Sequence, residues 1–83
     1  MKLEEIYDNL RAILVDQLQV KAEDIKPESE LIADLGINSL ELADLVLACE
    51  EKFNVEIKDD EIRKFMTLKD IATYLDVRIN HLH

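Results

Sequence analysis

The sequence predicts an all-α fold, a small four-helix bundle with a long loop between helices 1 and 2 and a short third helix. Three observations lead to this prediction. Apolar residues recur at three- and four-residue spacing along most of the chain, and no segment alternates like a β-strand. The only glycine and the only proline fall in one stretch that lacks the helical period. At 83 residues, the chain is expected to be a single domain, residues 1–83, near the lower size limit for an independent core.

The first helix is predicted to start near Leu3 and to run for about four turns, because one apolar stripe continues over that length. The stripe comprises Leu3, Ile6, Tyr7, Leu10, Ile13, Leu14 and Leu18. Between Gln19 and Asn38 the period breaks, which predicts a loop with a short helical turn in "SELIADL". The apolar residues expected to pin this loop to the core are Ile25, Leu31, Ile32, Leu35 and Ile37.

The second helix is predicted from Asn38 to Phe53. Asn38 suits the N-cap, and Glu41 can reach back to it in a capping box. At about 100° per residue, one sector of this helix is apolar and is predicted to be buried. It holds Leu42, Leu45, Val46, Cys49 and Phe53. Cys49 is therefore interpreted as a small core residue, with a reactive thiol as the alternative.

A short third helix is predicted around Asp59–Lys64. The fourth is predicted to begin at Thr67, because Thr67-Leu68-Lys69-Asp70 fits the capping pattern that satisfies free backbone N–H groups. Its apolar face is expected to continue through Ile71, Tyr74, Leu75 and Ile79.

The other side of the second helix carries Leu40 and Leu47 together with Asp44 and Glu51, and Glu50 stands at its edge. Folding explains such leucines poorly, because they face water among carboxylates. We interpret this side as a docking face, where apolar contacts give affinity and acids steer the partner. The alternative is that these are ordinary exposed leucines.

The charge balance is acidic, with 19 acids, 10 bases and a net charge of −9. No nucleic-acid binding is expected, because it requires a basic face, whereas partners with basic docking patches are favoured. Acidity that serves only solubility is the alternative. Segment 39–61 holds eight acids against two lysines, and this difference of −6 makes up most of the net charge.

Few residues could carry chemistry. The only histidines, His81 and His83, lie in the last three residues, where a Ser-His-Asp arrangement is not expected. A single cysteine and a single glycine allow neither a disulfide framework nor a glycine-rich phosphate loop, and no spacing suggests a metal. We expect no enzyme activity and no metal. Without an evident signal peptide or transmembrane run, we expect a location in the cytoplasm or an organelle matrix, with no membrane insertion. We also expect a monomer.

Ser39 opens the second helix within "DLGINSLELADL". If Asn38 is the cap, the Ser39 hydroxyl projects from the first turn, where free N–H groups and the positive helix end favour an anion. With no base nearby, Ser39 is interpreted as an attachment point for a phosphoester and not as a nucleophile. The alternative is that Ser39 itself caps the helix.

These residues resemble the acyl carrier protein family. "DLGINSLELADLV" is similar to its phosphopantetheine attachment motif, and "EEKFNVEI" and "MTLKDIATYL" are similar to its later helices. The resemblance implies that a phosphopantetheinyl transferase, using coenzyme A, attaches a phosphopantetheine arm to Ser39. The arm's thiol would carry acyl groups as thioesters between acyl-transferring and synthase enzymes. Asn38 departs from the usual aspartate and removes a charge from the site that the transferase reads.

By position, the resemblance implies partner docking through Leu40, Glu41, Asp44, Leu47, Glu50, Glu51 and Glu56. The first function hypothesis is a free-standing carrier in dissociated (type II) fatty acid synthesis. The alternative within the class is a specialised carrier for polyketide, aminoacyl or D-alanyl groups. The alternative outside the class is an unmodified acidic adaptor for basic partners.

A fatty-acid carrier gains by hiding its cargo from water. The helical geometry predicts a space beneath the second helix, with the short third helix as its movable wall. The predicted lining is Leu45, Cys49, Ile57, Ile62, Phe65 and Ile71. A chain of about six to eight carbons entering there would remove several methylenes from water, at about 0.8 kcal/mol each.

Overall fold

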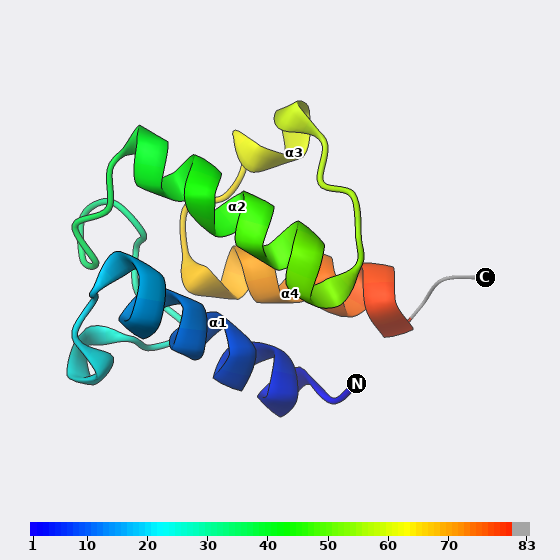
Figure 1. The fold of residues 1–83 in the computed structure, drawn as a ribbon, viewed down its shortest axis with the longest axis horizontal. Helices are drawn as coiled ribbons and strands as arrows, with labels where there is room; N and C mark the ends of the chain where they lie inside the picture. Colours follow the sequence, from blue (N-terminus) through cyan, green and yellow to red (C-terminus); the bar gives the residue numbers. More distant parts are fainter. Residues whose placement is uncertain (81–83) are drawn as a thin grey trace.

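The computed structural model describes residues 1–80, which pack around one hydrophobic core. The elements are α1 (Leu3–Leu18), the 3₁₀ turn η1 (Ala22–Asp24), α2 (Ser39–Phe53), α3 (Asp59–Ile62) and α4 (Leu68–Asn80). Figure 1 shows the long helices α1, α2 and α4 packed together, with α3 at the edge of the bundle. The predicted all-α bundle, with its long loop and short third helix, is confirmed. None of the helices in this part of the chain is long and apolar enough to cross a membrane. His81 and His83 lie outside the described residues.

The core forms where the apolar stripes of α1, α2 and α4 face one another. Its helical members are Ile6, Leu10, Ile13 and Leu14 of α1, Leu45, Val46, Cys49 and Phe53 of α2, and Leu68, Ile71, Ala72 and Leu75 of α4. Of the residues predicted for the stripes, Leu3 lies outside the core and is 44% exposed. The half-buried members pack against the core: Tyr7, Leu18, Leu42, Tyr74 and Ile79. The first buried residue is Ile6 in α1 and Leu45 in α2, so the buried stripes begin about one and about two turns inside these helices.

The long loop, residues 19–38, is tied to the segment around the start of α4. Leu31 N–H donates to Met66 O (2.9 Å), and Leu68 N–H donates to Ser29 O (3.0 Å). Ser29 is buried, and its hydroxyl makes two further hydrogen bonds within the loop. The chain is thus already anchored before it turns toward α2.

The prediction that Ile32 pins this loop is wrong, because its side chain is 62% exposed. Residues 31–35 form a turn, in which Asp34 N–H donates to Glu30 O (2.9 Å). Neighbouring side chains diverge in such a turn, so Leu31 enters the core and Ile32 faces water. The other predicted anchors are buried or half-buried: Ile25, Leu31, Leu35 and Ile37.

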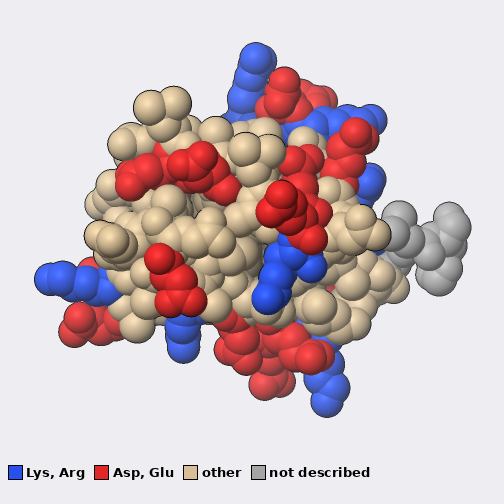
Figure 2. Space-filling model, viewed as in Figure 1, with Lys and Arg blue, Asp and Glu red and all other residues tan. Residues whose placement is uncertain are grey.

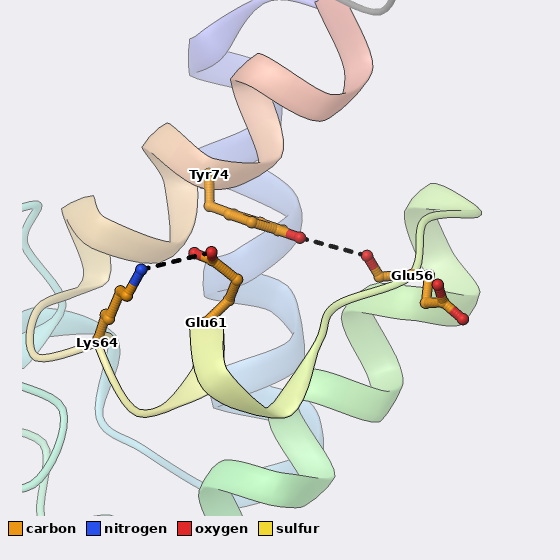
Figure 3. A network of polar contacts seen from close by, with 4 residues as sticks. All are labelled: Glu56, Glu61, Lys64 and Tyr74. Carbon is orange, nitrogen blue, oxygen red and sulfur yellow. Dashed lines mark hydrogen bonds and ion pairs between the residues drawn. The ribbon is translucent and has the colours of Figure 1, made fainter.

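The single turn α3 ends slightly earlier than predicted and is held by the residues that flank it. The hydroxyl of Tyr74, on α4, donates to Glu56 O (3.3 Å) before α3. The Tyr74 ring meets Phe65, after α3, edge-on with 5.6 Å between centroids. Figure 3 shows the hydroxyl contact together with the Lys64–Glu61 ion pair (3.6 Å). One side chain of α4 therefore contacts the chain on both sides of α3.

The predicted cap of α4 is present. Thr67 Oγ1 accepts from Asp70 N–H (3.2 Å), and Asp70 Oδ2 accepts from the N–H groups of Thr67 (3.0 Å) and Met66 (2.9 Å). These backbone donors, Thr67 first and Met66 second, hold the pKa of the Asp70 carboxyl below its ordinary value. The cap thus fixes the point where α4 begins.

Candidate attachment and docking site

Ser39 is the first residue of α2 and lies exposed at the end of the long loop. The residue before it caps the helix, because Asn38 Oδ1 accepts a hydrogen bond from Glu41 N–H (2.8 Å). Glu41 Oε1 in turn accepts from Asn38 N–H (3.0 Å). The capping box is therefore made without Ser39, whose hydroxyl has no hydrogen-bond partner within residues 1–80.

The first turn of α2 offers free donors beside this hydroxyl. Leu42 N–H donates to Asn38 O (2.9 Å), and Glu41 N–H is used by the cap. The N–H groups of Ser39 and Leu40 remain without an intrahelical partner, as is usual at a helix start. Together with the positive end of the helix dipole, they favour an anion at this position. A phosphodiester on the exposed Ser39 Oγ fits this environment.

Gly36 sets the direction in which the loop enters α2. Its φ of 69° lies in the left-handed region, which glycine adopts readily and other residues avoid. Its N–H donates to Ile32 O (3.1 Å), and the following Ile37 is 2% exposed. The turn and the buried Ile37 hold Asn38, and hence Ser39, at the rim of the bundle.

The outer side of α2 is both apolar and acidic. Leu40 and Leu47 are 79% and 59% exposed, and Asp44 and Glu51 are also exposed. Figure 2 shows acidic side chains bordering an uncharged region of the molecular face over α1 and α2. The two leucines thus lie in water, as the helical geometry predicts.

The other residues that the resemblance implies for docking also have structural contacts. Glu41 is half-buried in the capping box. Glu50 is half-buried, and its Oε2 accepts from Ile57 N–H (2.9 Å), which ties α2 to the segment before α3. Glu56 exposes its side chain, while its backbone oxygen accepts from the Tyr74 hydroxyl. The bond to Ile57 was not predicted, because it joins a helix residue to a loop beyond the helix end.

The residues predicted to line an acyl pocket all belong to the core or pack against it. Leu45, Cys49, Ile57, Phe65 and Ile71 are buried, and Ile62 is half-buried. An open hollow of about 560 Å³ lies between α2 and α3, and of the predicted set Ile57 and Ile62 line it. The other four lie in the core and not in the wall of this hollow. Its α2 side includes Ala43 and Val46, which the prediction missed. The sequence signal for this part of the lining was Ala43, a small residue beside the predicted apolar sector, which leaves space next to α2.

Cys49 is a core residue, as predicted. Its side chain has no exposed surface, and it is a free thiol. Burial, assisted by the charge of Glu50, raises the pKa of the Cys49 thiol from its ordinary 9.0 to about 12. Because the thiolate is the reactive form, this thiol is suited to packing and not to chemistry.

Comparisons with known proteins agree with this geometry. Residues 8–75 match the model of the phosphopantetheine attachment site family. An acyl carrier protein of Helicobacter hepaticus is 43% identical over 72 residues, covering 87% of this chain and 95% of the relative. One from Wolinella succinogenes is 44% identical over 71 residues, covering 86% and 93%. One from Nitratidesulfovibrio vulgaris is 43% identical over 70 residues, covering 84% and 92%. The chain therefore belongs to the acyl carrier protein family, whose cofactor is covalently attached phosphopantetheine.

Proposed function

We propose that the chain is a free-standing carrier of dissociated fatty acid synthesis and that Ser39 bears its phosphopantetheine arm. The family match supports the carrier function, and one observation carries the assignment of Ser39. Asn38 and Glu41 form the capping box of α2 through two reciprocal hydrogen bonds, and the exposed Ser39 hydroxyl takes no part in it. When attached, the arm supplies the terminal thiol that holds acyl intermediates as thioesters.

The start of α2 is suited to a phosphodiester once it has formed. The N–H groups of Ser39 and Leu40 face the added negative charge, and the helix dipole favours it. Asn38 is a neutral amide, so within the capping box only the Glu41 carboxylate carries negative charge that would repel the phosphodiester. We expect a separate phosphopantetheinyl transferase to modify this serine despite the missing aspartate.

Partners are proposed to dock on the outer side of α2. The exposed contacts are Leu40, Asp44, Leu47, Glu51 and Glu56, and Glu41 and Glu50 add charge from half-buried positions. The acids of segment 39–61 are complementary to basic patches on a transferase and on acyl-transferring or synthase enzymes. Complementary charge chiefly raises the association rate, which suits a carrier that visits several enzymes.

The acyl chain is proposed to shelter beneath α2, entering at the hollow beside α3. Ile57 and Ile62 stand at this entrance. Deeper contacts would come from Leu45, Cys49, Phe65 and Ile71, which are core residues. The short α3, held through its flanking residues, is the wall that would move.

The chain is proposed to act as a single domain of residues 1–83 and to perform no chemistry itself. The thioester is made and broken by the partner enzymes, while this protein presents the arm. A monomer is expected, since a net charge of −9 opposes self-association.

The attachment is tested by whole-protein mass after incubation with coenzyme A, magnesium and a broad-specificity phosphopantetheinyl transferase. The protein should gain one phosphopantetheine, and Ser39→Ala should gain none. Peptide mapping gives the control, because the chain's other serine, Ser29, is buried and already hydrogen-bonded. Modification of Ser39→Ala, or a mapped adduct on Ser29, would contradict the assignment.

A further inference from the structure

A second groove, of about 920 Å³, runs between α1 and α2. One wall is the docking side of α2, with Asp44, Leu47 and Glu51. The other wall is formed by α1, to which the proposed docking set assigns no residue. Any partner that covers the exposed Leu47 from this side must therefore also meet α1.

Two of the residues that line this groove have small side chains. Ala12 of α1 is exposed and Ala48 of α2 is half-buried, and both line it. Leu47 rises beside them with 59% of its surface in water. Alanines on facing helices allow another helix to approach closely, and an exposed leucine offers it an apolar contact.

Apart from Lys52, the charged side chains on the two walls are acidic. Asp16 on α1 faces the groove opposite Asp44 and Glu51 on α2, and all three are exposed. None of them forms an ion pair within the described part of the chain. Lys52 is the single basic side chain among the lining residues. Such a groove complements a positively charged occupant and repels an acidic one.

We propose that the groove between α1 and α2 docks a basic amphipathic helix of a partner protein, with α1 forming half of the contact surface. Leucine-like side chains of that helix would lie over Ala12 and Ala48, and arginine or lysine side chains on its two flanks would meet Asp16 and Glu51. This is the helix-in-groove mode of recognition, with acidic residues on both sides of the groove. The inference rests on the proposed carrier function only in that the partners are enzymes that handle the arm.

The test uses a fluorescein-labelled helical peptide of about 15 residues, some four turns, with leucines on one face and arginines flanking them. Its binding to the whole, arm-loaded protein is measured by anisotropy. Asp16→Lys should weaken binding about tenfold, through lost attraction and new repulsion. Ala12→Gln should weaken it without changing the charge, because it fills the floor of the groove.

Asp8→Lys is the matched control, since it makes the same charge change at an exposed site of α1 outside the groove. It should leave binding within about twofold of wild type, an effect expected only from the screened net charge. Equal weakening by Asp8→Lys and Asp16→Lys, no effect of Ala12→Gln, or no binding at all would overturn the proposal. Attachment of the arm is measured separately, by whole-protein mass before the binding experiment. A failure of the carrier function is therefore distinguishable from a failure of the groove to bind the peptide.

Discussion

Asn38 shows how one side chain can prepare a site by keeping its neighbour free. Its side chain accepts from Glu41 N–H at the start of α2, and the Glu41 carboxylate completes the capping box. Asn38→Ala should therefore lower the free energy of unfolding by about 1 kcal/mol, the usual value of an N-cap. Denaturant unfolding measures this loss. Asn38→Asp, which keeps a cap oxygen, serves as the control and should lose much less. Equal stability of wild type and Asn38→Ala would mean that the capping box contributes nothing.

Cys49 leads to a prediction about alkaline pH. With its pKa raised to about 12 in the folded protein, the thiol stays protonated when the unfolded chain has already lost that proton above pH 9.0. The unfolded state then binds fewer protons, so stability falls as pH rises between these values, by about 1.4 kcal/mol per pH unit for this group. Cys49→Ala removes that contribution. Its unfolding free energy should fall less steeply with pH than that of wild type, and parallel curves would contradict a buried thiol.

At the residue scale, the sequence was sufficient to predict the features that depend on local chemistry. The cap by Asn38, the free Ser39 hydroxyl and the buried Cys49 depend on spacing within a single helix, and the structure shows each of them. Ile32 and Glu50 were less predictable. The exposure of Ile32 depends on the shape of a turn. The hydrogen bond that Glu50 accepts from Ile57 N–H depends on how the loop after α2 folds back against the helix.

The elements differ in how they are stabilised, and α3 is the extreme case. It is a single turn, and Tyr74 contacts the chain before and after it. Tyr74→Phe keeps the ring against Phe65 but removes the hydrogen bond to Glu56 O. Amide exchange of Ile57 and Ile62 should become faster, while overall stability falls by about 1 kcal/mol or less. Tyr7→Phe on α1 is the control and should leave these amides unchanged. Unchanged exchange in Tyr74→Phe would show that the hydroxyl does not restrain α3.

At the element scale, the starts of α2 and α4 were predictable, because their N-terminal caps are formed by residues three apart in the sequence. The course of the long loop was not. Its anchors join residues far apart in the chain, such as Leu31 with Met66 and Ser29 with Leu68, and no local pattern contains such pairs. The turn η1 also lies in this loop and was not predicted.

The whole molecule combines a compact core with an acidic surface. Apart from the Lys64–Glu61 pair, no ion pair is formed among residues 1–80, although the full chain carries 19 acids. Most of its surface charge is therefore available to partners and does not hold the fold together. The fold rests on the apolar stripes of α1, α2 and α4, which also surround the proposed place of the cargo. Cargo and stability are coupled in such an arrangement, because an acyl chain beneath α2 adds to the same core.

This coupling gives the most direct test of the claim that the protein carries and shelters a fatty acyl chain. Octanoyl-loaded protein is compared with the same protein bearing the unacylated arm, and the melting temperature of each is measured. A ligand recognised only by the folded state stabilises it, so octanoylation should raise the melting temperature by about 5 °C or more. Ile62→Ala should change this increment more than Leu40→Ala, since Ile62 lines the hollow and Leu40 is 79% exposed elsewhere on α2. A melting temperature that octanoylation leaves unchanged or lowers would contradict the account and would favour a carrier of polar groups.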